Sequence, residues 1–164
     1  MNLKFILAFF FPALIYSCNP DTTKWQHIKK TMNVYPKDSM VSYISYPDGY
    51  PARKWINEAY KNYEFKRYCT NTVEVTFELS TPRVRSYLYQ DTFSIAKLLQ
   101  KEFQKNGVAH FVGQKLSNGE LKIYLYHEDK IEPVSTLFSF IIPNTGMIKS
   151  DPDWKTYATL FLEN

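Results

Sequence analysis

The chain has 164 residues, of which 45% are hydrophobic and 22% charged, and its formal net charge is +4. This length and composition are those of an ordinary globular protein with one domain. The positive charges are scattered along the sequence, so they give no argument for nucleic-acid binding, and we expect no nucleic-acid partner.

Residues 1–17 have the layout of a secretory signal peptide. Lys4 is followed by an uninterrupted apolar run from Phe5 to Ile15, and then by Tyr16-Ser17-Cys18. The apolar run is about half as long as the ~20 residues that a membrane-spanning helix needs. This length argues against a permanent transmembrane helix.

The end of this segment, Ile15-Tyr16-Ser17-Cys18, resembles the lipobox of bacterial lipoproteins, in which signal peptidase II cuts before a cysteine that carries lipid. The resemblance implies a multiply acylated Cys18 and a cell-envelope location on a membrane that faces the periplasm or the exterior. An ordinary secreted cut and an uncleaved anchor are the alternatives. Lipidation would leave Cys69 as the one free thiol, which we expect to be buried, and no intramolecular disulfide.

The segments that follow are expected to extend the domain with a strand and a helix. Residues 18–35 form a tether and N-terminal segment, in which Trp25 to Met32 is either a strand or a helical turn. Residues 36–164 form a single α+β domain. Its first strand is Met40 to Tyr46, where alternating side chains end at the turn residues Pro47-Asp48-Gly49.

Helical spacing dominates the next segment. Its apolar residues recur at helical intervals: Trp55, Ile56, Ala59 and Tyr63. This spacing predicts a helix over at least Lys54 to Tyr63. A basic and aromatic helix can bind anionic lipid or nucleic acid, but the preferred interpretation is that the aromatic residues are buried and the lysines solvated.

Thr72 to Leu79 is the clearest strand in the sequence, because apolar and polar residues alternate along it. Asp91 or Thr92 can cap the helix that follows, and Asn106-Gly107 ends it. The apolar stripe of this helix consists of Phe93, Ile95, Ala96, Leu99 and Phe103.

Asn118-Gly119 predicts a β-hairpin with a type I′ turn, because both residues tolerate the positive φ angles that this turn requires. In the simplest register, Ser117 pairs with Glu120 and His110 pairs with His127. One face of the hairpin is then mostly aliphatic and includes both histidines. The other face carries the candidate binding surface: Phe111, Lys122, Tyr124 and Tyr126.

Three elements are expected after the hairpin. Pro133 to Ile142 has the spacing of a short helix, and Gly146 to Lys149 can form a closing strand. Asp151-Pro152 begins a last helix, because aspartate caps helices and proline fits their first position. Its Trp154 and Tyr157 are interpreted as a packing plug that closes the sheet, with an aromatic platform for sugar or peptide as the alternative.

From Thr72 onward the order is strand, helix, strand, strand, helix, strand, which is that of the ferredoxin-like split βαβ arrangement. The expected fold class is therefore α+β, with an antiparallel sheet and two covering helices on one face. The first and third strands are neighbours at its centre. This arrangement places Glu74, Thr76 and Glu78 beside Lys122, Tyr124 and Tyr126 on an open face.

Several motifs match one family: Asn57-Glu58-Ala59-Tyr60, Phe111-Val112-Gly113-Gln114, Asn118-Gly119, Ile123-Tyr124-Leu125-Tyr126 and the ending Asp151-Pro152-Asp153-Trp154-Lys155-Thr156-Tyr157. In these motifs the chain, over roughly residues 57–162, resembles the bacterial family called domain of unknown function 695, which is related to the domain of the B-type regulator of ribonuclease E. The resemblance implies the ferredoxin-like fold and implies no reaction. That regulator binds a ribonuclease in the cytoplasm, whereas this chain carries an export signal, so this partner is not expected here.

His110 and His127 are the candidate residues for metal or hydrolytic chemistry. As cross-strand neighbours about 5 Å apart, with Glu128 and Asp129 beside them, they could hold zinc. Their place on the helix-covered face weakens this hypothesis, and we expect no metal or other cofactor. The sequence contains no nucleophile elbow, phosphate-binding glycine loop or paired-cysteine metal motif.

The sequence favours a lipid-anchored, non-catalytic binding or accessory module. Such a module would reach the membrane through lipid on Cys18 and contact a protein partner through the open sheet face or the hairpin edge. The alternatives are a metal-dependent or hydrolytic enzyme centred on His110 and His127, and an immunity-type protein.

Overall fold

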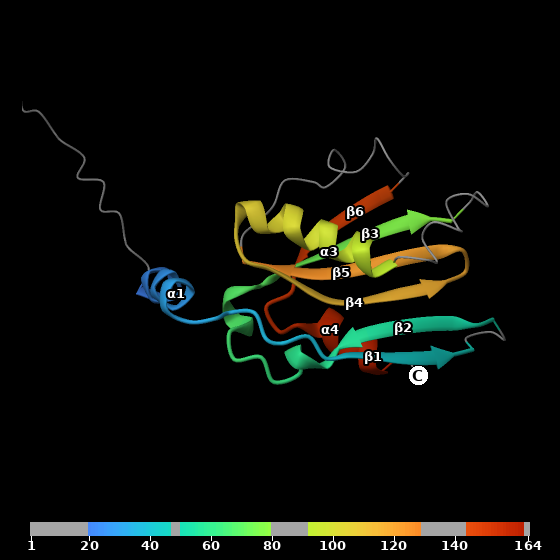
Figure 1. Cartoon of the computed structure of the whole chain (residues 1–164), viewed down its shortest axis with the longest axis horizontal. Coiled ribbons are helices and arrows are strands. Elements are labelled where there is room, and N and C mark those ends of the chain that lie inside the picture. Colours follow the sequence, from blue (N-terminus) through green and yellow to red (C-terminus); the bar gives the residue numbers. More distant parts are fainter. Residues whose placement is uncertain (1–19, 47–49, 80–91, 129–143, 163–164) are drawn as a thin grey trace, which may run out of the picture. The chain divides into compact units, whose positions relative to one another are not determined.

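The computed structural model describes residues 20–46, 50–79, 92–128 and 144–162 (Figure 1). The chain divides into two units, Met1–Asn33 and Val34–Asn164. In the first unit the described residues form helix α1, Pro20–Thr31, with Asp21 in its first turn and two lysines in its last. These charges suit the helix dipole. The segment from Trp25, expected as a strand or a helical turn, is helical as far as Thr31. Across the described ranges, no helix is both long and apolar enough to span a membrane.

The second unit is built on a six-stranded antiparallel sheet with the strand order β1-β2-β4-β5-β3-β6. The strands are β1 (Met40–Ser45), β2 (Ala52–Asn57), β3 (Asn71–Glu78), β4 (Ala109–Ser117), β5 (Glu120–His127) and β6 (Asn144–Ser150). With α1 and the helices α3 (Thr92–Phe103) and α4 (Lys155–Leu162), the described chain is α+β, as expected. The sheet has more strands than the four expected from Thr72 onward, because β1 and β2 extend it beside β4.

The predicted helix from Lys54 to Tyr63 is wrong. Its first part is strand β2, whose residues alternate between buried and more exposed positions. Pairing with β1 on one side and β4 on the other outweighs the helical spacing of the apolar residues. Two short 3-10 turns follow, η2 (Glu58–Tyr60) and η3 (Lys66–Tyr68), and the Asn57 side chain caps the first of them.

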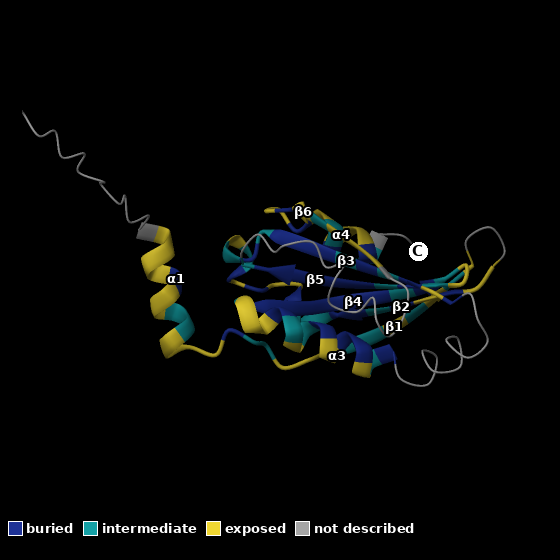
Figure 2. Cartoon of the chain, turned by 90° about the horizontal axis from the view of Figure 1, so that it is seen from above, coloured by how far each residue is buried: buried dark blue, intermediate teal, exposed yellow. Residues whose placement is uncertain are grey.

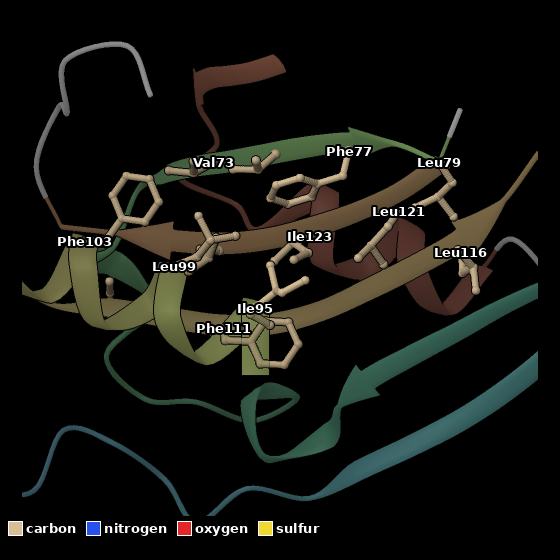
Figure 3. Close-up of a cluster of buried hydrophobic side chains, with 14 residues drawn as sticks. Val73, Phe77, Leu79, Ile95, Leu99, Phe103, Phe111, Leu116, Leu121 and Ile123 are labelled. Atoms are coloured by element: carbon tan, nitrogen blue, oxygen red, sulfur yellow. The ribbon is translucent and has the colours of Figure 1, made fainter. Parts of the chain in front are cut away.

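The predicted helix after residue 91 is confirmed as α3, which packs its apolar stripe against one face of the sheet (Figure 3). Ile95, Ala96, Leu99 and Phe103 are buried in this core. The sheet contributes Val73, Val75, Phe77, Leu121, Ile123 and Leu125 to it. A 3-10 turn, η4 (Gln104–Asn106), ends the helix, and Gly107 with φ of 143° takes the chain into β4.

Helix α4 lies on the opposite face of the sheet from α3 (Figures 1 and 2). The buried Lys54 ammonium of β2 donates to the Leu160 carbonyl near the end of α4, 3.0 Å away, where the helix dipole favours a cation. The Tyr157 hydroxyl donates to the carbonyl of Asn57. The sheet face that carries Tyr124 and Tyr126, predicted to be open, is therefore covered over part of its area by α4. The predicted helix from Pro133 to Ile142 lies outside the described residues.

Asp151 caps α4 as predicted, because its carboxylate accepts from the backbone N–H groups of Lys155 and Thr156 at 2.8 Å each. Pro152, however, stands in the turn before the helix and not at its first position. The predicted closing strand from Gly146 to Lys149 is confirmed as part of β6, which pairs with β3.

Asn118 and Gly119 form the predicted hairpin turn, with φ angles of 50° and 76°. Ser117 pairs with Glu120 and Gln114 with Ile123, and the predicted register holds as far as Gly113 and Tyr124. Beyond this point a β-bulge between Phe111 and Gly113 shifts the pairing by one residue. This one-residue shift decides where the candidate functional residues lie.

Candidate functional site

The bulge divides the predicted binding surface between the two faces of the sheet. Because Val112 is the extra residue, Phe111 pairs with Leu125 and belongs to the core under α3, not to the face of Tyr124 and Tyr126. A one-residue shift exchanges the faces of every side chain beyond it. The expected grouping of Phe111 with the two tyrosines is therefore wrong.

The remaining members of that surface are covered or half-buried. Tyr126 is fully buried and Tyr124 is 7% exposed, so they form no exposed aromatic patch. Lys122 lies beside them as predicted, and its ammonium forms an ion pair with Glu74 on β3 at 3.2 Å. The predicted acidic row of β3 does lie next to this part of β5. What remains accessible here is mainly polar.

The same bulge places the His110 side chain on the other face of the sheet from the His127 side chain. His110 pairs with Tyr126, whereas Ala109 takes the expected place opposite His127. His127 stays on the α3 side, where its ring contacts Phe103 and its Nε2 lies 3.2 Å from the Phe103 carbonyl oxygen. The predicted pairing of the two histidines is therefore wrong. Within the described ranges, no group of three or more His, Cys, Asp or Glu side chains is placed to hold a metal ion.

His110 is instead the centre of a buried aromatic network. Its Nδ1 lies 3.1 Å from the Tyr60 hydroxyl and its Nε2 lies 2.9 Å from the Tyr63 hydroxyl, and the Tyr63 hydroxyl also donates to the carbonyl of Val34. His110 is 0% exposed, and burial lowers its pKa to about 3. Burial likewise raises the pKa of both tyrosines. The imidazole is thus neutral at physiological pH and out of reach of a substrate.

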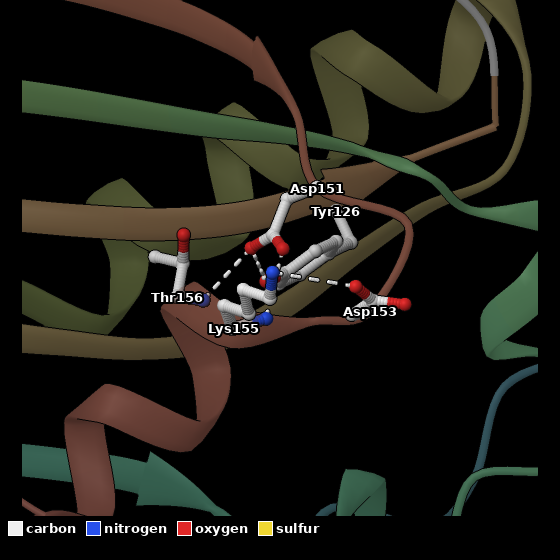
Figure 4. A network of polar contacts seen from close by, with 5 residues as sticks. All are labelled: Tyr126, Asp151, Asp153, Lys155 and Thr156. Atoms are coloured by element: carbon white, nitrogen blue, oxygen red, sulfur yellow. Dashed lines mark hydrogen bonds and ion pairs between the residues drawn. The ribbon is translucent and has the colours of Figure 1, made fainter.

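A second polar network joins this cluster to α4 (Figure 4). The Tyr126 hydroxyl donates to the Asp151 carboxylate at 2.6 Å and accepts from the backbone N–H of Tyr157. Burial alone would raise the pKa of Asp151, but the hydrogen bonds from Tyr126, Thr156 and Lys155 outweigh it, so the pKa lies below its ordinary value. These contacts fix the start of α4 against the sheet.

Trp154 and Tyr157 are buried, which confirms their interpretation as a packing plug. The Trp154 ring stacks on Tyr126 with 3.9 Å between centroids, and its indole N–H donates to the carbonyl of Cys69. Trp154 has a φ angle of 56°, an uncommon backbone conformation that this packing holds in place. Cys69 is buried, as expected, and free of disulfide bonds.

An accessible concave site lies elsewhere, on the α3 face of β1 and β2. It is a groove of about 580 Å³ that we call the Trp55 groove. Its lining includes Ile44, Tyr46, Tyr50, Arg53, Trp55 and Leu116. The turn residues Asn118 and Gly119 of the hairpin also line it. Ile44, Tyr46 and Tyr50 are 60%, 69% and 67% exposed, an unusual concentration of apolar surface.

Arg53 gives this groove its charge. Its guanidinium lies over the Trp55 ring, 5.2 Å from the centroid, and its Nε donates to the Ser42 hydroxyl at 3.3 Å. The edge of Phe93 supports the Trp55 ring in turn. In the described part of the chain, no carboxylate forms an ion pair with Arg53, and no described residue of the lining is acidic.

The sequence pattern did not predict this groove, because the residues from Lys54 onward were expected to form a helix. A helix would place Arg53 and Trp55 on different sides, whereas in a strand they are two positions apart and share a face. The available signal was the alternation of Ala52, Lys54 and Ile56 with Arg53 and Trp55, although a lysine on the buried side conceals it.

Comparisons of this chain with family models, curated proteins and solved structures found no match.

Proposed function

We propose that this protein is a lipid-anchored, non-catalytic binding module of the bacterial envelope that holds a protein partner in the Trp55 groove. One observation carries the proposal: the groove combines exposed aromatic and aliphatic side chains with a preorganised guanidinium. Such a mixture of apolar surface and one oriented polar group is typical of ligand sites. By contrast, His110 and its tyrosine partners are buried in the core.

The enzyme hypothesis loses its premise, since it required His110 and His127 to be neighbours. The bulge separates them onto opposite faces, and each has partners within the core. No observation in the described residues favours a second site of this kind.

We also propose that the part of the unit from Asn71 onward has the ferredoxin-like arrangement and belongs with the domain-of-unknown-function-695 family. The order β6-β3-β5-β4 within the sheet supports this, because the first and third strands of a split βαβ unit are neighbours flanked by the fourth and second. Strands β1 and β2 would then be additions that carry the groove.

Site-specific photo-crosslinking tests the binding function. Benzoylphenylalanine replaces Tyr50 in the groove or, as a control, Met147 on β6, which is 51% exposed and lies at the other edge of the sheet. Irradiation of intact cells should give protein adducts from position 50 and not from position 147. Adducts from both positions alike, or from neither, would overturn the proposal.

A further inference from the structure

Strand β1 is the edge of the sheet beside the Trp55 groove. It pairs with β2 on one side, and none of the described residues pairs with its other side. Edge strands offer unpaired backbone N–H and C=O groups to any other extended chain. Natural proteins therefore protect them with charges, prolines or bulges.

The two edges of this sheet differ in that protection. The β1 sequence, Met-Val-Ser-Tyr-Ile-Ser, contains no charged residue, proline or glycine. The opposite edge strand, β6, contains Gly146 and Lys149. The unprotected edge is the one next to the groove, where Ile44 and Tyr46 are exposed.

Arg53 is directed toward this same edge. Ser42, to which its Nε donates, belongs to β1, so the Arg53 side chain extends from β2 over the edge strand. Its position over the Trp55 ring gives the guanidinium a second contact on this face. A guanidinium fixed in this way is suited to a carboxylate, which it binds through charge-assisted hydrogen bonds.

Resting on the proposed function, we infer that the partner enters as an extended acidic segment that pairs with β1 as a seventh strand. Its backbone completes the hydrogen bonds of the β1 edge, and one of its carboxylates binds Arg53. Apolar side chains two positions away from that carboxylate, on the same face of the added strand, cover Ile44, Tyr46 and Tyr50. Because side chains alternate along a strand, the carboxylate must stand on the groove side of the added strand.

This alternation supplies the test. The mature chain, kept in detergent micelles, is applied to an array of immobilised eight-residue peptides in which Thr and Val strictly alternate and a single Glu replaces one residue at a time. The apolar Val side chains suit the groove, so they fix which face of the peptide is turned toward it. Binding should rise about tenfold when the Glu replaces a Val and stay unchanged when it replaces a Thr, because the gain is that of one charge-assisted pair on the groove side. Peptides with Gln in place of Glu should show no such difference.

Two variants connect the effect to the groove. Arg53→Gln should abolish the preference for Glu at alternate peptide positions. Lys149→Gln, at an exposed position of β6, should leave that preference unchanged. Both side chains are at the surface, so both variants should fold, which circular dichroism verifies. A preference for Glu at every position alike, or a preference at alternate positions that survives Arg53→Gln, would overturn the inference.

The two proposals can fail separately. Adducts from position 50, together with peptide binding that does not depend on the position of Glu, would leave the groove a binding site. They would overturn only the inference that its partner is an acidic strand. Adducts at twice the mass of the chain would identify a second copy as the occupant, which also overturns the acidic strand. Absence of adducts would overturn the binding function itself.

Discussion

His110 shows how one buried imidazole ties the stability of the fold to pH. In the folded protein its pKa is lowered to about 3 by burial, whereas an unfolded chain has the ordinary value of about 6.5. Between these values the unfolded state binds more protons, so the free energy of unfolding decreases as pH falls. Above pH 6.5 this contribution is fully present.

We therefore predict that the free energy of unfolding, measured with urea, falls steadily from pH 7 to pH 4. His110→Phe should be less stable at pH 7, because it leaves the hydroxyl of Tyr60 without its hydrogen-bond partner. Its stability should nevertheless depend less on pH over this range. An unchanged slope in the variant would assign the pH dependence to other groups.

Gly113 lies where β4 packs closely against both β2 and α4. A Cβ at this position would lie 2.7 Å from the carbonyl oxygen of Trp55 and 3.2 Å from a methyl of Leu160. We predict that Gly113→Ala lowers the free energy of unfolding by about 1–3 kcal/mol, the usual cost of overpacking. Gly119→Asn is the control that should cost less, because nothing lies within 4 Å of the new Cβ and asparagine is among the side chains least strained at the positive φ of 76°. Equal melting temperatures for the two variants would contradict the predicted clash at Gly113.

Among the elements, α4 depends most clearly on a single side chain. Asp151 accepts three hydrogen bonds, two of them from the first residues of the helix. We predict that Asp151→Ala costs about 1–3 kcal/mol of unfolding free energy, as loss of a cap and of a charged hydrogen-bond partner. Asp153→Ala should cost less than about 0.5 kcal/mol, because the Asp153 side chain is 70% exposed and forms only a surface ion pair. Denaturant titration of both variants measures the two free energies of unfolding.

The elements also show where sequence patterns predict structure and where they do not. The Asn118-Gly119 turn, the strand from Asn71 and helix α3 were predictable, because local turn chemistry and periodicity agree with their burial. Strand β2 was not, since its place is decided by pairing with two strands distant in sequence. The bulge at Val112 leaves no local mark, and it alone displaced His110 and Phe111 from their predicted faces. The Trp55 groove is lined by residues of β2, so it could not be predicted without that strand.

At the scale of the whole molecule, the proposed anchor and the folded unit are separate features. We predict that Cys18→Ser abolishes incorporation of labelled palmitate and releases the protein from the membrane fraction. Cys69→Ser should keep both properties, because that thiol is buried in the fold. Membrane retention of Cys18→Ser without label would indicate an uncleaved signal segment, and so contradict lipidation.

The difference in charge between the edge strands β1 and β6 bears on how many copies of the chain can join edge to edge. Sheets polymerise when both edges accept a strand, because every added molecule then presents a new open edge. Here the uncharged β1 can accept one strand, while β6 offers Gly146 and Lys149. If two copies paired through their β1 edges, the joined sheet would present β6 at both ends, so the assembly would stop at two copies instead of growing into a fibre.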